Sequence, residues 1–426
     1  MLCKSHFAGP VSGSDETLVA YATHLHRGGY SIAIVLLYPP AHDDRYYVRL
    51  RQTGVEVVTI ASSRRAQLVL GWLRAAAARL SRTFRVPASL GRWSRVAWHT
   101  VVRRFAASYQ KKCDKYFQGT SADLMHVLTP DPGAELLIRA GAAAGIPVLY
   151  QELGTPNPMP ELEPHYERFL KVFPLCDEVA ALSPLLARQW EEKVQDAQAV
   201  SVLPLLVEDG DTRRAESARH PGGCCVGFAA RLERGKGPLV LLDAFAQVRQ
   251  QVPDITLRLA GTGRQEEAVR ARAASLGVSA ACDFRGAYTD AEGKGAFMRG
   301  LDVFVLPSLA EGTPNSVIEA MAHGLPIVAS AVGGIPDLIT PETGILVPPG
   351  DAPALAAAIL SLASDPEARA RMGLAARARY EALFSPRSVL PVLVNTYRRV
   401  ASKDRRTDPA QRAPRFTHPW LEGARS

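Results

Sequence analysis

The chain has 426 residues, of which 47% are apolar and 22% charged, as is usual for a globular protein. Its length predicts two domains with ample buried core. The net charge of +8 leaves nucleic acid, a membrane surface and an acidic substrate open as partners. No apolar run reaches the roughly 18 residues of a membrane-spanning helix, so none is expected. The first residues also lack the apolar core of a signal peptide, which favours a cytoplasmic location.

Short apolar runs in the first half predict the strands of one sheet. A helix is predicted over 17–27, and Ser183 is expected to cap another helix that begins at Pro184. The first strand contains Lys4 and is weak, which leaves open a true start upstream. Residues 200–206 lead towards a linker. The predicted strands cover 2–7, 31–37, 55–60, 122–129, 148–152 and 177–183. The strand at 177–183 is expected to be the last of this sheet.

A strongly basic segment follows the third of these strands. Residues 61–120 contain thirteen Lys and Arg and one acid, Asp114, so the segment carries +12 and the rest of the chain −4. Trp72, Trp93 and Trp98 lie among these cations, and part of the segment has the apolar spacing of a helix. Such a segment suits an anionic membrane surface, and it also suits a solvated helical hairpin over the first sheet. No recognition motif accompanies the charge, so nucleic acid is not expected as a partner.

The cysteines and an Asp-x-Asp sequence are the two features that resemble metal ligands, and neither is predicted to bind a metal. The six cysteines are scattered and form no C-x-x-C pair, which favours reduced thiols. The acids in Asp209-Gly210-Asp211 lie in a charged stretch with no adjoining strand, which indicates that they are solvated. No metal site is therefore predicted.

The second half repeats the alternation of strands and helices. Lys236 is followed by Gly237 where a P-loop needs Ser or Thr, which excludes that motif. Glu266 stands where a dinucleotide fingerprint needs its third glycine, which argues against an oxidoreductase. The predicted strands cover 224–229, 255–260, 302–307, 325–329 and 344–347, and the predicted helices cover 238–250, 351–362, 366–384 and 388–400.

The stretch 302–336 carries the most information about function. A buried strand, a loop with Gly and Pro, a helix and a second strand form a βαβ unit. Asn315 or Ser316 is expected to cap the helix, and Gly324 to follow its last residue. The loop would lie at the carboxyl edge of a parallel sheet, where such folds bind ligands. The N–H groups at the start of the helix favour an anion such as a diphosphate.

Two carboxylates belong to this unit, Glu311 at the start of the loop and Glu319 inside the helix. A carboxylate repels a bare phosphate, but it accepts hydrogen bonds from the hydroxyls of a sugar or a ribose. The unit therefore predicts a ligand in which a diphosphate is flanked by hydroxylated rings.

These residues resemble the signature of the retaining family 4 glycosyltransferases, which have the GT-B fold. In that signature two Glu are separated by seven residues, as Glu311 and Glu319 are here. The resemblance extends to about residue 400, and it is more specific in the second half than in the first. The other positions in register with the signature are Pro307, Ser308, Gly312, Pro314, Ala320, Ala322, Gly324 and Pro326.

The resemblance implies how the donor, a nucleotide-sugar, would be held. Glu311 would bind hydroxyls of the donor sugar, and Glu319 would bind the ribose. The backbone near the sugar and the phosphates would come from Gly312, Thr313, Pro314 and Asn315.

Arg231 and Lys236 match a Gly-Arg-Leu…Lys-Gly element of the same family. They would hold the donor diphosphate and stabilise the charge that grows on it as it leaves, since Arg can bind phosphate in bidentate fashion and Lys adds a point charge. Arg285 or Tyr288 would stack on the nucleotide base.

In the first half the resemblance implies three further candidates. Gly13, in the family's glycine-rich loop, would let the backbone approach a donor phosphate or an acceptor. His126 fits the first His of an Asp-x-x-His-x-His strand end, where a His faces the donor sugar, but Leu128 stands at the second. Glu152 ends the following strand, and Leu153 replaces an imidazole found in relatives. His126 and Glu152 are candidates for a catalytic or a structural role.

The implied fold class is α/β, namely GT-B, with two Rossmann-like domains whose parallel sheets face each other across a cleft. The expected boundaries are an acceptor-side domain at 1–204, a linker at 205–222, a nucleotide-sugar-binding domain at 223–385, a crossover helix at 386–402 and a disordered tail at 403–426.

The implied reaction is retaining transfer of a sugar from a nucleotide-diphosphate sugar, such as a UDP- or GDP-sugar, to an acceptor hydroxyl, with no cofactor and no metal. Polysaccharide, exopolysaccharide or glycolipid synthesis is the implied process. The expected partners are the donor, a carbohydrate or lipid-linked acceptor and, through 61–120, the inner face of a membrane. Two alternatives stay open: an epimerase or phosphorylase of the same fold, and an inactive nucleotide-sugar sensor or scaffold, which Leu128 and Leu153 favour.

Overall fold

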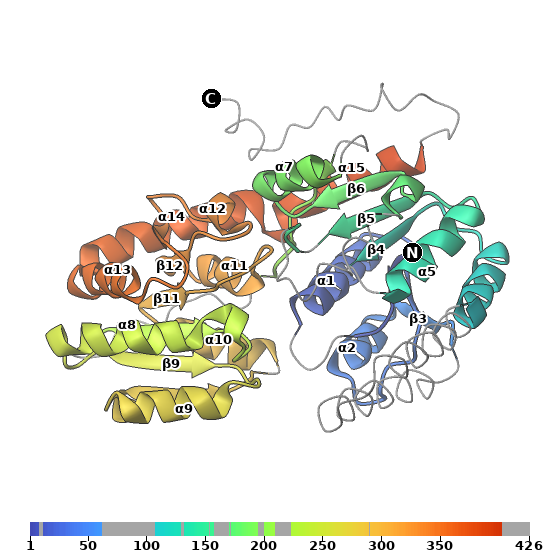
Figure 1. Ribbon diagram of the computed structural model, residues 1–426. Helices are drawn as coiled ribbons and strands as arrows, with labels where there is room; N and C mark the ends of the chain where they lie inside the picture. Colours follow the sequence, from blue (N-terminus) through green and yellow to red (C-terminus); the bar gives the residue numbers. More distant parts are fainter. Residues whose placement is uncertain are drawn as a thin grey trace, which may run out of the picture.

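The molecule consists of two α/β domains, each built on one parallel sheet, in a computed structural model (Figure 1). Most of the basic segment 61–120, the stretch 209–211, Leu153 and the tail 403–426 lie outside the described residues. The structure describes residues 1–7, 12–61, 107–128, 132–152, 154–156, 170, 172–194, 200–208, 223–288 and 290–402.

The first sheet has seven parallel strands in the order β3-β2-β1-β4-β5-β6-β7. The weak strand predicted at 2–7 is β1, an interior strand, and its Lys4 is buried because it forms an ion pair with Asp15. The prediction that 177–183 closes the sheet is wrong: β7 adds an edge strand too short to produce a periodic pattern. The strands are Leu2–Lys4 (β1), Ala33–Leu36 (β2), Glu56–Thr59 (β3), Met125–Leu128 (β4), Val148–Glu152 (β5), Glu178–Ala181 (β6) and Val200–Val202 (β7).

Two helices of the first domain differ from the sequence prediction. α1 starts four residues earlier than predicted, because Ser12 rather than a later residue is its N-cap and accepts from the Asp15 N–H. α2 is not predicted, since only Tyr46 and Leu50 are buried and the apolar stripe is sparse. Ser183 caps α7 before Pro184, as predicted. The helices are α1 (Gly13–Arg27), α2 (Arg45–Thr53), α5 (Pro132–Ala143), the short 3₁₀ helix η1 (Phe173–Leu175) and α7 (Pro184–Lys193), and residues 107–118 are also helical.

The second sheet has six parallel strands in the order β10-β9-β8-β11-β12-β13, and helices cover both of its faces (Figure 1). β11 lies in the interior of the sheet between β8 and β12, so the loop that follows it emerges near the middle of the carboxyl edge. The strands are Cys225–Ala229 (β8), Thr256–Ala260 (β9), Cys282–Gly286 (β10), Val303–Leu306 (β11), Ile327–Ser330 (β12) and Gly344–Val347 (β13).

The cap predicted for the helix after β11 is wrong. Pro314 occupies the N-cap position of α11, and Asn315 is already helical. The Asn315 side chain instead points to the first domain, where its Nδ2 donates to the Gly13 carbonyl at 3.1 Å. Gly324 follows the helix with a φ of 64°, as expected. The helices of the second domain are η3 (Arg234–Lys236), α8 (Pro238–Gln251), α9 (Glu266–Ser275), η4 (Ser279–Ala281), α10 (Ala291–Arg299), α11 (Asn315–Ala322), α12 (Ile335–Leu338), α13 (Ala352–Ser364) and α14 (Pro366–Leu383).

The last helix, α15 (Pro386–Ala401), packs on the first domain, although it follows α14 of the second (Figure 1). Its buried Val389, Leu393 and Val400 belong to the same apolar cluster as Leu2 of β1 and Leu18 of α1. The end of the chain therefore ties the two domains together. Among the described residues, no helix is both long and apolar enough to cross a membrane.

Candidate active site

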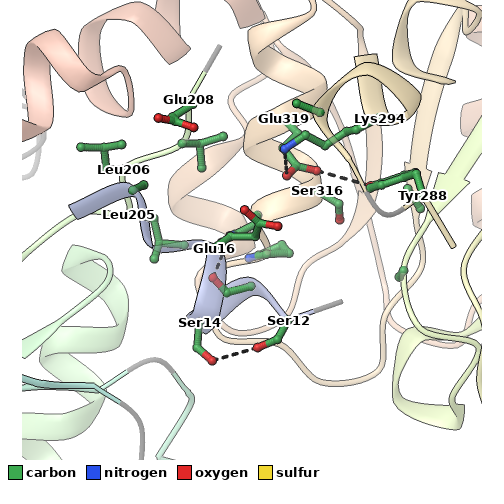
Figure 2. Close-up of a pocket in the computed structure, with 18 of the residues that line it drawn as sticks. Ser12, Ser14, Glu16, Leu205, Leu206, Glu208, Tyr288, Lys294, Ser316 and Glu319 are labelled. Atoms are coloured by element: carbon green, nitrogen blue, oxygen red, sulfur yellow. Dashed lines mark hydrogen bonds and ion pairs between the residues drawn. The ribbon is translucent and has the colours of Figure 1, made fainter. Parts of the chain in front are cut away.

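A cavity of about 870 Å³ lies between the two domains. One wall comes from α1, α2 and residues 205–208, and the other from the loops that follow β8, β9, β10 and β11 together with α10 and α11. Figure 2 shows side chains from both walls around this space, with Glu16 of α1 facing Glu319 of α11. The carboxyl ends of the strands of two parallel sheets thus meet at one cleft, the usual ligand site of such sheets.

Glu311 lies in the loop after β11 and is 7% exposed. Its Oε1 accepts from Lys236 Nζ at 2.6 Å and from Ser308 Oγ at 2.7 Å. Its Oε2 accepts no hydrogen bond from any other described residue. The carboxylate is therefore fixed through one oxygen, and the other is available to a hydroxyl of a ligand.

Lys236 and Arg231 bring two cations to the cavity. Lys236 ends η3, and Gly237 then takes a φ of 66°, where a Cβ would lie 2.0 Å from the Pro307 carbonyl. Glycine is therefore needed for this turn to pack against the end of β11. Arg231 follows β8, lines the cavity and is exposed, and it has no ion-pair partner among the described residues. One paired and one unpaired cation suit a diphosphate.

The loop from Gly312 to Pro314 and the start of α11 also line the cavity. The N–H groups of Asn315 and Ser316 have no acceptor within the described parts of the chain, so the positive end of the helix dipole is open to an anion. Thr313 Oγ1 is buried and likewise has no hydrogen-bond partner among the residues described. Because buried polar groups are nearly always satisfied, this hydroxyl is a candidate hydrogen-bonding group for a ligand of the cavity.

Glu319 forms a second fixed carboxylate in the same cavity (Figure 2). Its Oε1 lies 2.8 Å from Lys294 Nζ, and Tyr288 Oη donates to its Oε2 at 3.5 Å. Burial alone would lower the pKa of Lys294, but the charge and the hydrogen bond of Glu319 raise it more, so the amine stays protonated. Burial and the Glu319 charge raise the pKa of Tyr288 well above its usual range, so the phenol stays a donor.

The wall formed by the first domain is charged, which the sequence analysis did not foresee. Glu16 of α1 is held by Arg45 and by Arg49, whose Nη1 lies 2.6 Å from Glu16 Oε2. Arg49 also lies 3.7 Å from Glu208, and His24 Nε2 lies 3.2 Å from Glu208. The nearby His24 side chain lowers the pKa of Glu208 more than its partial burial raises it.

One signal for this wall was present in the sequence. Residues 13, 16, 20, 24 and 27 recur at the spacing of a single helix face, and all of them line the cavity. Arg27 ends this face and has no ion-pair partner in the described part of the chain. The arginines of α2 could not be found in this way, because α2 itself is not predicted.

The structure does not bring three of the predicted site residues to the cavity. His126 is fully buried on β4, and its Nδ1 lies 2.8 Å from Tyr397 Oη of α15. Glu152 is fully buried at the end of β5 and accepts from the Gly154 N–H at 2.8 Å and from the Tyr150 hydroxyl. Arg285 forms an exposed ion pair with Asp283 at 2.6 Å. None of the three is among the lining residues.

The other predicted residues do come together. Ten of them line the one cavity: Gly13, Arg231, Lys236, Tyr288, Glu311, Gly312, Thr313, Pro314, Asn315 and Glu319. Within the described ranges, no three His, Cys, Asp or Glu side chains are grouped in a way that could hold a metal ion. All six cysteines are free thiols.

Two parallel-sheet, Rossmann-like domains that face each other across a ligand cleft define the GT-B class, as the resemblance implied. HepE of Anabaena, solved in complex with UDP and glucose, has the same fold, with a TM-score of 0.68 and 19% identity over 93% of this chain and 98% of that one. Residues 223–365, in the second domain, match the family model described as Glycosyl transferases group 1.

Two curated relatives are similar to part of the chain. A GDP-mannose-dependent monoacylated alpha-(1-6)-phosphatidylinositol monomannoside mannosyltransferase of Corynebacterium glutamicum is 33% identical over 163 residues, or 37% of this chain and 42% of the relative. A D-inositol 3-phosphate glycosyltransferase of Pseudarthrobacter chlorophenolicus is 37% identical over 171 residues, or 39% of this chain and 40% of the relative. The chain thus matches less than half the length of each relative.

Proposed function

We propose that the chain is a retaining, family 4 glycosyltransferase that moves a sugar from a nucleotide-diphosphate sugar to an acceptor hydroxyl. One observation carries the proposal. Glu311 is buried and fixed through Oε1, while Oε2 is left for a hydroxyl, in the same cavity as the second carboxylate, Glu319, and the unpaired Arg231. Two hydroxyl acceptors and two cations in one cavity match the sugar, the ribose and the diphosphate of a nucleotide-sugar.

In this proposal the donor lies along the wall of the second domain. Glu311 accepts from a hydroxyl of the donor sugar, and Glu319 accepts from the ribose. Arg231, Lys236 and the open N–H groups at the start of α11 bind the diphosphate. These cations and N–H groups offset the charge of the leaving diphosphate, so the reaction needs no metal. The donor is a co-substrate, and no cofactor is involved.

The proposed reaction is a same-face displacement. The acceptor oxygen forms a bond to the anomeric carbon as the bond from that carbon to the diphosphate oxygen breaks. The leaving phosphate takes the proton of the acceptor hydroxyl, and the configuration at the anomeric carbon is retained. The resemblance favours this course over a double displacement, which would need a protein nucleophile. Closure of the cleft would exclude water and favour transfer over hydrolysis.

The acceptor is proposed to lie against the first domain. There the helix face that ends in Arg27, which has no ion-pair partner among the described residues, offers a cation to a carbohydrate or lipid-linked acceptor. An acceptor with an anionic group would fit it well. The names of the two curated relatives support this, since one contains a phosphatidylinositol monomannoside and the other D-inositol 3-phosphate, and both compounds carry a phosphate. We place the protein at the cytoplasmic side of a membrane, in polysaccharide, exopolysaccharide or glycolipid synthesis.

A screen of nucleotide-sugars tests the proposal. UDP-, GDP- and ADP-sugars are added in turn, and the melting temperature is measured, since a ligand of the folded state raises it. The donor that stabilises the protein is then incubated with acceptor-rich membrane extract, and release of the nucleoside diphosphate is measured with and without EDTA. Acceptor-dependent release that survives EDTA supports a metal-independent transferase. A trapped glycosyl-enzyme adduct would contradict the same-face displacement.

The same screen separates the alternatives. An epimerase would convert the donor without an acceptor, and a phosphorylase would need free phosphate. A sensor or scaffold would bind the donor without turnover in the extract. No stabilisation by any nucleotide-sugar would contradict the proposed function itself.

A further inference from the structure

Glu319 is held by Lys294, which has been given no role so far, and by Tyr288, which the resemblance places at the nucleotide base. Lys294 comes from α10, and Tyr288 from the loop after β10, so three separate segments meet at one carboxylate. Asp290 caps α10 through the Gly293 N–H at 2.6 Å, which fixes the turn that carries Lys294. The Tyr288 ring packs against Phe297 of the same helix, with the ring centroids 6.0 Å apart.

Each oxygen of the Glu319 carboxylate accepts one hydrogen bond, and each bond comes from a different residue. Lys294 Nζ lies 2.8 Å from Oε1 of Glu319, and Tyr288 Oη lies 3.5 Å from Oε2. A carboxylate can accept about two hydrogen bonds on each oxygen, so one position remains on each. Neighbouring hydroxyls of a ribose can donate to both oxygens of one carboxylate. The remaining capacity of Glu319 therefore matches a 2′,3′-diol.

We propose that Lys294 and Tyr288 are positioning residues that orient Glu319 towards the 2′- and 3′-hydroxyls of the donor's ribose, so that the cavity selects ribonucleotides over 2′-deoxyribonucleotides. The inference rests on the proposed function, because it takes a nucleoside diphosphate as the ligand of this cavity. It adds the two residues that set the selectivity and assigns Tyr288 to the carboxylate rather than to the nucleotide base.

The physical basis is that a buried carboxylate without a cation is unstable as an anion. Glu319 is 7% exposed, and its charge is matched by Lys294 alone among the described residues. Without that cation the charge of the carboxylate would be uncompensated, and the side chain would turn to another donor and lose its orientation towards the diol. A hydrogen bond to a charged group is lost when the 2′-hydroxyl is absent, which changes affinity by about tenfold or more.

The test compares binding of UDP, GDP and ADP with that of their 2′-deoxy forms by calorimetry. For the wild type we expect a preference of about tenfold or more for the ribo form of the base that binds best. Lys294→Met should reduce this ratio to about threefold or less, and Tyr288→Phe should reduce it by a smaller factor. Lys294→Arg, which keeps the cation, should restore most of it. Glu292→Gln, an exposed change on the same helix, is the control and should leave the ratio unchanged.

The outcomes separate the inference from the function on which it rests. If the wild type prefers the ribo form and Lys294→Met keeps both its affinity and its ratio, the inference is wrong and the proposed function stands. If the wild type binds no nucleoside diphosphate, the proposed function is wrong and the inference with it. An equal loss of affinity for both forms would assign a merely structural role to Lys294. If Lys294→Met does not fold, the ratios of Tyr288→Phe and Lys294→Arg decide.

Discussion

At the scale of single residues, the chemistry of the cleft depends on pairs of charges rather than on isolated groups. Four of the six Lys and Arg that line the cavity have a carboxylate partner within ion-pair distance, and Arg27 and Arg231 are the two without one among the described residues. A pair of this kind fixes the carboxylate in place. It also means that removal of one partner leaves the other buried or half-buried without compensation.

We expect Glu311→Gln to reduce kcat/KM by about 10²-fold, because the amide binds the sugar hydroxyls less strongly and leaves Lys236 without its partner. Affinity for the nucleoside diphosphate alone should change much less, since its phosphates and ribose are held elsewhere. The measurement is the rate of nucleoside diphosphate release with saturating acceptor. Glu367→Gln, an exposed change on α14, is the control. Activity of Glu311→Gln within about threefold of the wild type would contradict the role given to Glu311.

The burial of His126, which lies outside the cavity, predicts how the free energy of unfolding depends on pH. Burial, and then the charged N-terminus, lower its pKa from 6.5 to about 3. In the unfolded chain the imidazole binds a proton below pH 6.5, whereas in the folded protein it stays neutral, so the unfolded state binds more protons between these values. The free energy of unfolding should therefore fall as the pH decreases through 6.5, by about 2 kcal/mol at pH 5 from this group.

The matched variant is His126→Gln, which keeps a hydrogen-bonding group near Tyr397 but does not titrate. Urea unfolding at pH 7 and pH 5 gives the pH dependence of each protein. The wild type should lose more stability than the variant between the two values. Equal losses would show that His126 does not titrate on unfolding.

A site residue could be predicted from the sequence when it lies in a short local motif, and not when its role depends on a contact with a distant residue. Glu311, Glu319, Arg231 and Lys236 were found because each lies in a short motif next to a strand end. Lys294 was not found, because its role depends on a contact with Glu319 across 25 positions, which no local pattern records. His126 and Glu152 matched a family pattern, but strand geometry and α15 place them in the interior.

At the scale of elements, the loop that carries Glu311 is shaped by a turn on a different segment. Gly333 has a φ of 56°, and a Cβ there would lie 1.9 Å from the Glu311 carbonyl. The Gly334 N–H also donates to the Gly312 carbonyl at 2.8 Å. The turn before α12 thus supports the loop from behind, and it leaves no room for a side chain.

We expect Gly333→Ala to lose at least about tenfold in activity, because the new Cβ would push the Glu311 backbone out of place. Backbone strain at positive φ adds a cost of about 1–2 kcal/mol in stability. Gly277→Ala is the matched control, since Gly277 has a φ of 71° with nothing within 4 Å of the added Cβ, and it lies outside the cavity. Melting temperature and activity are measured for both. Full activity in Gly333→Ala would show that the loop does not depend on this turn.

Most elements could be predicted, because buried parallel strands are continuous apolar runs and the caps of helices are local. β7 and α2 could not: β7 has three residues, and α2 buries two side chains in nine positions. The predicted N-cap of α11 is wrong for a different reason. Asn315 is a good N-cap by type, but its side chain is used by the other domain, which a local rule cannot show.

At the scale of the whole molecule, the two domains are joined at several points around the cleft. Asn315 contacts Gly13 across the cavity, and Asp337 of α12 accepts from the Leu185 N–H at the start of α7 at 2.7 Å. α15 returns to the first sheet. A charge of +12 in residues 61–120, against −4 elsewhere, gives the chain a strong electrostatic asymmetry.

We expect the protein to bind anionic vesicles through that segment. In flotation with vesicles of phosphatidylglycerol and phosphatidylcholine, the bound fraction should rise with the anionic lipid and fall in high salt. Replacement of the arginines of 61–106 by glutamine should abolish flotation. The control is an equal number of exposed arginines replaced elsewhere. If the wild type does not float, or the replacement has no effect, the solvated-hairpin interpretation is favoured.

In the proposed complex one nucleotide-sugar lies in the cleft, where Glu311, Glu319, Arg231 and Lys236 hold it. The most direct measurement is a crystal structure of the protein with the nucleotide-sugar selected by the stability screen. We expect the phosphates within hydrogen-bond distance of Arg231 and Lys236, a sugar hydroxyl on Glu311 and the ribose on Glu319. A ligand bound outside the cleft, or in it with its phosphates out of reach of both cations, would contradict the account.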